Sequence, residues 1–287
     1  MTASPNIPSV RVAYQGEPGA FSQTAAWLLL GDDAATIPFR SFEEMFQSVA
    51  AGDADCCVTP IENSLAGSIH RNYDLLLSSG LTILGETFLR IVHNLIAPPG
   101  TALDDVRRVY SHPVALAQCG RFLRQHPEME PEPMHDTAGA VRVVMERRQP
   151  SEAAIASEAA ANIYGGVILA TNVEDDPQNF TRFFLLAPPS ASIRPLTEPS
   201  AQRWKTSLLL EIANTPGSLY RALGVFATAN IDLSKIESRP IPGKPRDYAF
   251  YLDVIGNVAD TSIAEAIEQL REDADLVRVL GCYPTSW

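Results

Sequence analysis

Residues 179–189 read NFTRFFLLAPP and predict a strand that opens with a hydroxyl and a guanidinium. The apolar run from Phe183 to Ala187 indicates a buried strand, and two prolines end it. Thr181 and Arg182 could simply start that strand, because threonine suits the pleat and arginine can extend into water. They could instead present hydrogen-bond donors to a ligand. This fragment alone favours the structural interpretation, so the other motifs have to decide.

A carboxylate, an amide and a hydroxyl follow one another where another predicted strand ends. The strand covers residues 54–61, and Glu62, Asn63 and Ser64 come next. Ligands of open α/β sheets bind outside the carboxyl ends of the strands. The same residues also suit a plain turn leading to a helix that Ser68 would cap. On the sequence alone, the functional and structural interpretations are evenly balanced.

Two predicted helix starts carry groups that could meet an anion or donate a proton. In GEPGAFS, Gly16 and Gly19 allow a close approach of the backbone, and Ser22 lies near the start of the helix. Free N–H groups at that end of a helix can hold an anion. His112 ends a strand just before Pro113 opens a helix, and it could be a cationic partner or a proton donor. An ordinary glycine turn and a solvated histidine are the simpler interpretations of these spacings.

Several kinds of chemistry are disfavoured by the motifs. The sequence has no GxGxxG, no GxSxG and no HExxH, and its five histidines show no metal-ligand spacing. The four cysteines form no CxxC pair, which favours buried, reduced thiols. A dinucleotide site, a hydrolytic triad and a metal centre are therefore not expected.

Charge and hydropathy narrow the partners and the compartment. The chain has 287 residues, a net charge of −12 and 46% hydrophobic residues. This acidity argues against binding to nucleic acid or to an anionic membrane, and no segment is apolar enough to span a bilayer. The first ten residues, MTASPNIPSV, lack a secretory pattern, so we expect a cytoplasmic protein. An anionic ligand would need a local exception to the overall charge.

Two series of strands and helices precede a proline-rich segment, and a different order follows it. The alternation up to residue 187 predicts an α/β domain, and its two series suggest two lobes with a cleft. After the proline- and serine-rich segment the predicted order is βαββαβ, which is ferredoxin-like and leaves a sheet face and edges that favour dimerisation. The predicted boundaries are 8–79 plus 175–187 for the first lobe, 80–174 for the second, 188–203 for the linker and 204–287 for the C-terminal domain.

In order along the chain, the motifs resemble those of the prephenate dehydratase family. The matching segments are GEPGAFS, PIENSLAGS, SHPVALAQC, DTAGAV, NFTRF, NTPGSL and KIESRP, and they cover nearly the whole chain from Val10. Each segment is weak alone, but seven in the right order are highly specific. The sequences GEPGAFS and ENSLAGSIHRNYDLL are also similar to those of arogenate dehydratases, which act on the aminated substrate.

The resemblance implies an α/β fold with a two-lobed, periplasmic-binding-protein-like catalytic domain followed by a ferredoxin-like ACT domain. It implies a hydro-lyase that removes water and carbon dioxide from prephenate to give phenylpyruvate in phenylalanine biosynthesis, with neither a metal nor an organic cofactor. It further implies a homodimer or homotetramer with phenylalanine as allosteric effector. Many bacterial relatives carry an N-terminal chorismate mutase, which this chain is expected to lack.

The resemblance also assigns roles to individual residues. The family's TRF motif matches Thr181, Arg182 and Phe183, and its threonine is implicated in catalysis. Because a neutral hydroxyl is a poor general acid, we expect Thr181 to donate a hydrogen bond to the leaving hydroxyl, with the proton supplied by Glu62, by His112 or by water. Arg182 could anchor a carboxylate or brace the lobe in an ion pair. The predicted substrate-binding residues are Ser22, Glu62, Asn63, Ser64, His112, Arg182 and Phe183.

NTPGSL and KIESRP match the effector-binding segments of ACT domains. Phenylalanine is expected to bind there, at a dimer interface. The family usually has alanine where Ser218 stands, which is a small departure. The predicted effector-binding residues are Pro216, Gly217, Ser218, Leu219, Glu237, Ser238, Arg239 and Pro240.

Two alternative functions stay open at this point. The first is an arogenate dehydratase, which would run the same reaction on a substrate carrying an amino group in place of the keto group. The second is a non-catalytic amino-acid sensor with the same domains, and a sensor would have no need for the hydroxyl of Thr181.

Overall fold

The computed structural model describes residues 9–196, 203–241 and 243–285, which form two compact units. Unit 1 comprises residues 9–80 and Thr87–Ser192, and unit 2 comprises Leu81–Glu86 and the described residues from Ile193 onward. Residue 8, residues 197–202 of the predicted linker and residues 286–287 lie outside the described residues. The boundaries expected from the sequence stay predictions, and they had grouped residues 81–86 with the second lobe.

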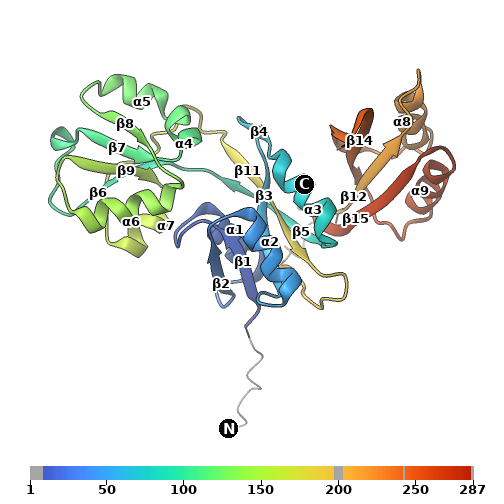
Figure 1. Ribbon diagram of the computed structural model, residues 1–287, viewed down its shortest axis with the longest axis horizontal. Coiled ribbons are helices and arrows are strands. Elements are labelled where there is room, and N and C mark those ends of the chain that lie inside the picture. Colours follow the sequence, from blue (N-terminus) through green and yellow to red (C-terminus); the bar gives the residue numbers. More distant parts are fainter. Residues whose placement is uncertain (1–8, 197–202, 242, 286–287) are drawn as a thin grey trace, which may run out of the picture. The chain divides into compact units, whose positions relative to one another are not determined.

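The first lobe of unit 1 is built on a sheet with the order β2-β1-β3-β11 (Figure 1). Strand β1 is parallel to β2 and β3, whereas β11 runs antiparallel to β3, and the short β4 also pairs with β3. Val12, Ala13 and Tyr14 of β1 are fully buried, as expected for a central strand covered on both faces. The elements are β1 Arg11–Gln15, α1 Phe21–Leu30, β2 Ala35–Phe39, α2 Phe42–Ala51, β3 Cys56–Asn63, β4 Gly67–Ser68, α3 His70–Ser79 and β11 Phe180–Ala187.

The second lobe of unit 1 has a sheet with the order β10-β6-β9-β7-β8. Apolar residues of α6 and α7 pack on one face of this sheet, and those of α4 and α5 pack on the other (Figure 1). The elements are β6 Asn94–Ala97, the 3-10 helix Leu103–Asp105, β7 Arg108–Ser111, α4 Pro113–Gln118, α5 Gly120–Gln125, β8 Glu130–Pro133, α6 Thr137–Arg147, β9 Glu152–Ala156, α7 Glu158–Tyr164 and β10 Val167–Ala170.

Three elements of this lobe differ from the sequence expectation. The helix predicted to open at Pro113 is followed directly by a second one, so that α4 and α5 are divided at the buried Cys119. Strand β8 was missed because the prolines of EPEP argue against a strand, yet β8 lies at the sheet edge, where proline is tolerated. Helix α7 was missed although its signals were present: Ser157 caps its start, and Gly165 ends it in a left-handed conformation.

Unit 2 has the predicted βαββαβ order, and its sheet order is β13-β14-β12-β15. Helices α8 and α9 bury their apolar faces in one cluster with the sheet, including Leu208, Leu210, Phe226, Ile263 and Ile267. The ferredoxin-like prediction is confirmed. The elements are β12 Arg203–Ile212, α8 Ser218–Thr228, β13 Leu233–Ile241, β14 Lys244–Ile255, α9 Thr261–Asp273 and β15 Leu276–Thr285.

Strand β5, Thr82–Arg90, begins in unit 2, where it runs parallel to β15. Ile83 lies opposite Gly281, and a Cβ added to Gly281 would stand only 2.3 Å from the carbonyl oxygen of Ile83. Further along β5, the Glu86 side chain, which is only 2% exposed, accepts hydrogen bonds from Lys205 Nζ at 2.7 Å and Thr285 Oγ1 at 2.6 Å. None of the described helices has the length and hydropathy needed to cross a membrane.

We predict that Gly281→Ala destabilises the protein, because its methyl group would displace β5 from β15. Overpacking of this kind typically costs about 1–3 kcal/mol. Gly224→Ala in α8 is the matched control: a Cβ there meets nothing within 4 Å, and alanine is the better helix former by about 0.5–1 kcal/mol. Urea denaturation should give opposite signs for the two variants, and equal midpoints would contradict the prediction.

Candidate active site

A cleft of about 680 Å³ is lined by residues from both lobes of unit 1. The first lobe contributes the start of α1, the segment after β2, the ends of β3 and β4, and the beginning of β11. The second lobe contributes α4 and the residues at the start of α6. The cleft therefore collects most of the polar motifs that the sequence placed at strand ends and helix starts.

Strand alternation decides which of the predicted residues reach this cleft. Thr181 pairs with Asn63 across β11 and β3, and both side chains line the cleft together with Phe183. The next pair in the register, Arg182 and Glu62, is not among the residues that line it. The structure thus brings together Asn63, Thr181 and Phe183.

Arg182 instead lies buried among aromatic rings. Its guanidinium carbon is 4.7 Å from the ring centre of Phe184 and 5.8 Å from that of Phe88, and the residue is only 4% exposed. These are cation–π contacts, so the ion-pair bracing and the carboxylate binding considered from the sequence both stay predictions. Of the two candidate proton donors, Glu62 and His112, only His112 lines the cleft.

The amide of Asn63 sets the polarity of the hydroxyl beside it. Asn63 Oδ1 accepts from the backbone N–H groups of Leu65 at 3.0 Å and Ala66 at 2.8 Å. Since a backbone N–H can only donate, Nδ2 must point the other way, and it lies 2.9 Å from Thr181 Oγ1. Thr181 is therefore the acceptor in this bond, which leaves its hydroxyl hydrogen available for a ligand in the cleft.

Ser64 does not line the cleft and instead bonds the backbone at the start of β11. Its hydroxyl donates to Gln178 O at 2.8 Å and accepts from Phe180 N at 3.0 Å. Ser68, considered as a helix cap, lies in β4 and lines the cleft, while α3 has Ile69 at its N-cap without a side-chain cap bond.

The start of α1 lines the cleft with Ala20, Phe21 and Ser22. Ser22 is 7% exposed and lines the cleft, and its N-cap neighbour Ala20 supplies no side-chain acceptor. The first N–H groups of a helix have no partner inside it. Gly19 has a φ of +91°, and a Cβ there would stand 2.6 Å from the Cα of Ala160 in α7. Glycine thus lets this turn pack closely against the second lobe.

His112 is a neutral hydrogen-bond donor in the cleft. Its Nδ1 accepts from Val114 N at 3.2 Å as the N-cap of α4, so Nε2 carries the hydrogen. Burial, aided by the nearby His135, lowers the pKa of His112, whereas Asp136 opposes this shift.

Sequence reasoning missed several polar residues of the cleft. Arg40 lines the cleft and follows β2 at the carboxyl end of that strand. Because ligands of open α/β sheets bind outside the carboxyl ends of the strands, the position of Arg40 could have been predicted. Its side chain forms no ion pair in the described part of the chain, whereas Arg71 pairs with Glu43. His93 and Gln118 also line the cleft. Gln118 lies within the motif SHPVALAQC but was not singled out, and His93 lies outside the quoted motifs.

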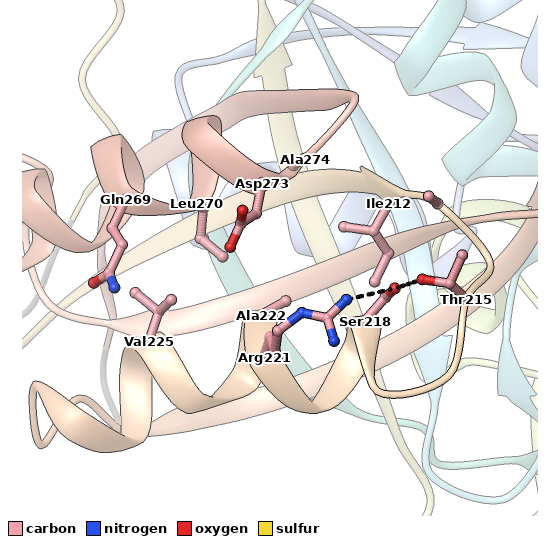
Figure 2. A pocket seen from close by; sticks show the side chains of 11 residues that line it. Ile212, Thr215, Ser218, Arg221, Ala222, Val225, Gln269, Leu270, Asp273 and Ala274 are labelled. Carbon is pink, nitrogen blue, oxygen red and sulfur yellow. Dashed lines mark hydrogen bonds between the residues drawn. The ribbon is translucent and has the colours of Figure 1, made fainter.

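A smaller cavity of about 340 Å³ in unit 2 contains part of the predicted effector segment. Gly217, Ser218 and Leu219 line it, together with Tyr248 and Phe250 of β14. Gly217 has a φ of +85° at the start of α8, a conformation that favours glycine. Figure 2 shows the adjoining pocket between α8 and α9, where the Ser218 hydroxyl contacts Thr215 Oγ1 at 2.6 Å and Arg221 Nη2 at 3.3 Å.

The remaining predicted effector residues do not line this cavity within one chain. They are Pro216, Glu237, Ser238, Arg239 and Pro240. The last four lie on β13, where Glu237 pairs with Lys235 at 3.7 Å and Pro240 stands opposite Tyr248 of β14. The two predicted segments therefore sit at the same end of the sheet without sharing a pocket.

Comparison with known proteins gives two family matches. The family described as Prephenate dehydratase matches residues 12–191, and the ACT domain family matches residues 206–272. A relative from Arabidopsis thaliana, arogenate dehydratase/prephenate dehydratase 1, chloroplastic, is 42% identical over 289 residues, covering 96% of this chain and 72% of its own length.

Two solved structures match nearly the whole chain. Prephenate dehydratase from Arthrobacter aurescens in complex with L-Phe has a TM-score of 0.86 and 32% identity, over 96% of this chain and 90% of that one. GqqA, described as a novel type of quorum quenching acylase, has a TM-score of 0.85 and 36% identity, over 96% of this chain and 98% of that one.

The expectation of a cytoplasmic protein is wrong on this comparison. Relatives from Arabidopsis thaliana are named as chloroplastic, which points to a plastid rather than the cytoplasm. The expectation rested on reduced cysteines and on the lack of a secretory pattern. Neither observation separates one reducing compartment from another.

We predict that the free energy of unfolding falls as the pH is lowered from about 7.5 to 5. The unfolded chain binds a proton on His112 near pH 6.5, whereas the folded chain resists it because its pKa is lowered. The stability due to neutral His112 is thus present above about pH 6.5 and lost as the pH falls through the folded pKa. His112→Asn keeps an acceptor for Val114 N–H without titrating, so chemical denaturation should show a smaller slope. An unchanged slope would contradict this assignment.

Proposed function

The chain belongs to the prephenate dehydratase family, and on this premise we propose that it converts prephenate to phenylpyruvate in the cleft of unit 1. The observation that carries the proposal is the Thr181 hydroxyl, which lines the cleft with its hydrogen uncommitted. Arogenate is the second candidate substrate, favoured by two relatives from Petunia hybrida at 40% and 42% identity that are named arogenate dehydratases.

The reaction needs hydrogen bonds more than it needs a strong acid or base. Prephenate carries a ring carboxylate and a pyruvyl carboxylate. As the ring carboxylate leaves as carbon dioxide, the electrons of its C–C bond enter the ring, and the hydroxyl on the opposite carbon departs and takes up a proton to form water. The product ring is aromatic, so the driving force is already in the substrate. The protein has to hold the anions and stabilise the departing oxygen.

We assign stabilisation of the departing oxygen to Thr181. Asn63 donates to Thr181 Oγ1, and a hydroxyl that accepts a hydrogen bond becomes a better donor itself. Negative charge grows on the departing oxygen only as the C–O bond breaks. The bond from Thr181 therefore strengthens in the transition state, which is the requirement for a rate effect.

The carboxylates of the substrate have two sets of donors in the cleft. The start of α1 offers backbone N–H groups and the Ser22 hydroxyl, and the segment after β2 offers the guanidinium of Arg40. His112 adds a neutral Nε2–H, so we assign it a hydrogen bond to an anion or to the departing oxygen in place of the proton transfer considered from the sequence. These groups supply the local exception to the chain's net charge of −12.

The test of the function is turnover of both substrates by the purified protein. Phenylpyruvate formed from prephenate is followed by its absorbance, and phenylalanine formed from arogenate is followed by chromatography. A comparison of kcat/KM assigns the preferred substrate. If neither phenylpyruvate nor phenylalanine forms, the result would favour an amino-acid sensor and overturn the proposal.

We predict that Thr181→Val lowers kcat by about 10²–10³-fold with little change in KM, because one transition-state donor is lost. Thr181→Ser keeps the hydroxyl but loses the methyl group that restricts its rotamer, so it should retain much more activity than the valine variant. Thr59→Val is the matched control on β3. Thr59 is fully buried, its hydroxyl has no hydrogen-bond partner among the described residues, and it does not line the cleft. Near wild-type kcat for a folded Thr181→Val enzyme would refute the role of the hydroxyl.

We also propose that phenylalanine binds unit 2 and inhibits the reaction, with the homodimer or homotetramer expected from the sequence still a prediction. An ACT domain and a relative solved with L-Phe support this. Gly217 and the β14 aromatic residues of the 340 Å³ cavity would contact the ligand. Allosteric coupling typically amounts to about 1–3 kcal/mol, so inhibition should change the apparent affinity for substrate at least several-fold.

We predict that Gly217→Ala weakens phenylalanine binding by roughly tenfold, since the substitution strains a left-handed backbone beside the cavity. Its Cβ would also meet Arg221 Nη1 at 3.1 Å. Gly243→Ala is the matched control, with a φ of +79° and no atom within 4 Å of its Cβ. Calorimetry should show weaker binding only for Gly217→Ala, and equal affinities in both variants would exclude this cavity.

A further inference from the structure

A chain of side-chain amides connects the Asn63–Thr181 pair to a buried histidine in the cleft. Asn63 Nδ2 also donates to Asn179 Oδ1 at 2.8 Å, and Asn179 Nδ2 donates to Gln118 Oε1 at 3.0 Å. The same Gln118 oxygen lies 3.1 Å from His93 Nε2. His93 is 2% exposed and lines the cleft beside Phe21, whose ring meets it edge to face.

The direction of every bond in this chain follows from its first member. Two backbone N–H groups hold the oxygen of Asn63, so its amide nitrogen faces Asn179. Asn179 must therefore present its oxygen to Asn63 and its nitrogen to Gln118. Gln118 then offers an oxygen that can only accept, and the bond to His93 exists only if Nε2 carries a hydrogen.

The tautomer of His93 is therefore determined by the two backbone N–H groups that hold the oxygen of Asn63. With the hydrogen on Nε2, a neutral ring has its lone pair on Nδ1, which is buried without a hydrogen-bond partner in the described part of the chain. Protonation would place an unpaired N–H there. Burial lowers the pKa of His93, opposed by the bond to Gln118 and by the charge of Glu174, whose Oε2 accepts from the His93 backbone N–H at 2.9 Å.

The hydrogen-bonded series of amides also includes residues at the places where the backbone passes between the two lobes. His93 lies between the end of β5 and β6, and Asn179 immediately precedes β11. Gln118 ends α4, the helix that His112 caps in the second lobe, whereas Thr181 belongs to the sheet of the first lobe. A change in any of these bonds would alter how the two sets of cleft residues face each other.

We infer that His93 is a positioning residue: as a neutral Nε2–H donor it holds Gln118 and Asn179 in one orientation, and so keeps α4 aligned with the Asn63–Thr181 pair. The catalytic part of this inference rests on the proposed function, whereas the tautomer does not. His93 acts through Gln118 and need not touch the substrate.

Two substitutions separate positioning from simple packing. His93→Gln keeps an N–H donor near the place of Nε2, and His93→Leu removes it at similar volume. We expect His93→Leu to lower kcat by about 10–100-fold at nearly unchanged KM, and His93→Gln to recover most of it. His126→Leu is the control, because His126 pairs with Glu128 and does not line the cleft. A folded His93→Leu enzyme with wild-type kcat would overturn the positioning role.

Nitrogen NMR of histidine-labelled protein tests the tautomer directly. The signals that disappear in His93→Gln should show Nε2–H and a bare Nδ1 between about pH 6 and 8. Asn179→Asp replaces the donor to Gln118 by an acceptor, so Gln118 should turn its amide and His93 should move its hydrogen to Nδ1. A wild-type Nδ1–H ring or imidazolium would overturn the inference. If neither substrate is turned over, the proposed function and the positioning role fail together, whereas the nitrogen shifts still decide the tautomer.

Discussion

Much of the candidate site depends on one buried side-chain amide. Asn63 lies at the end of β3, and its oxygen accepts two backbone N–H groups of the following turn. An amide has distinct donor and acceptor ends, so holding one end determines what the other end can bind. The nitrogen reaches Thr181 and Asn179, and through them the polarity of the hydroxyl and of the amide chain is set. A leucine at this position would keep the volume and remove that direction.

The proposed substrate is an anion, whereas the protein is acidic overall. Most of the groups that would attract an anion carry no full charge. They are the N-terminus of α1, hydroxyl groups and histidines whose pKa is lowered by burial. Full charges are few, and Arg71 is already paired with Glu43. Oriented dipoles bind an anion without a counter-charge that would have to be desolvated. They also suit a reaction in which the ring carboxylate must finally leave as a neutral molecule.

Unit 2 contains a buried ion pair that involves the first half of β5. Lys205 and Glu86 have side chains 4% and 2% exposed, and Thr285 adds a hydrogen bond to the same carboxylate oxygen. Such a pair is costly to desolvate, and removing one partner leaves an uncompensated charge. Glu86 belongs to the first half of β5, whose second half continues into unit 1. The ion pair thus specifies where that strand pairs in unit 2.

The sequence by itself determined the fold class, the βαββαβ order of the second unit and the motifs of the cleft, because periodicity, helix caps and turn residues are local signals. It also singled out Asn63, His112, Ser22 and Thr181. Only the tertiary structure decided that Glu62 and Arg182 do not line the cleft, since neighbouring residues on a strand point to opposite faces and the register of β3 with β11 selects the face. Arg40 and His93 were not predicted because neither lies in a quoted motif, and Gln118 lay in the motif SHPVALAQC without being assigned a role. The bond between Asn63 and Thr181 joins residues 118 positions apart, and contacts at that separation are set by how the strands pair and pack, which no local pattern records.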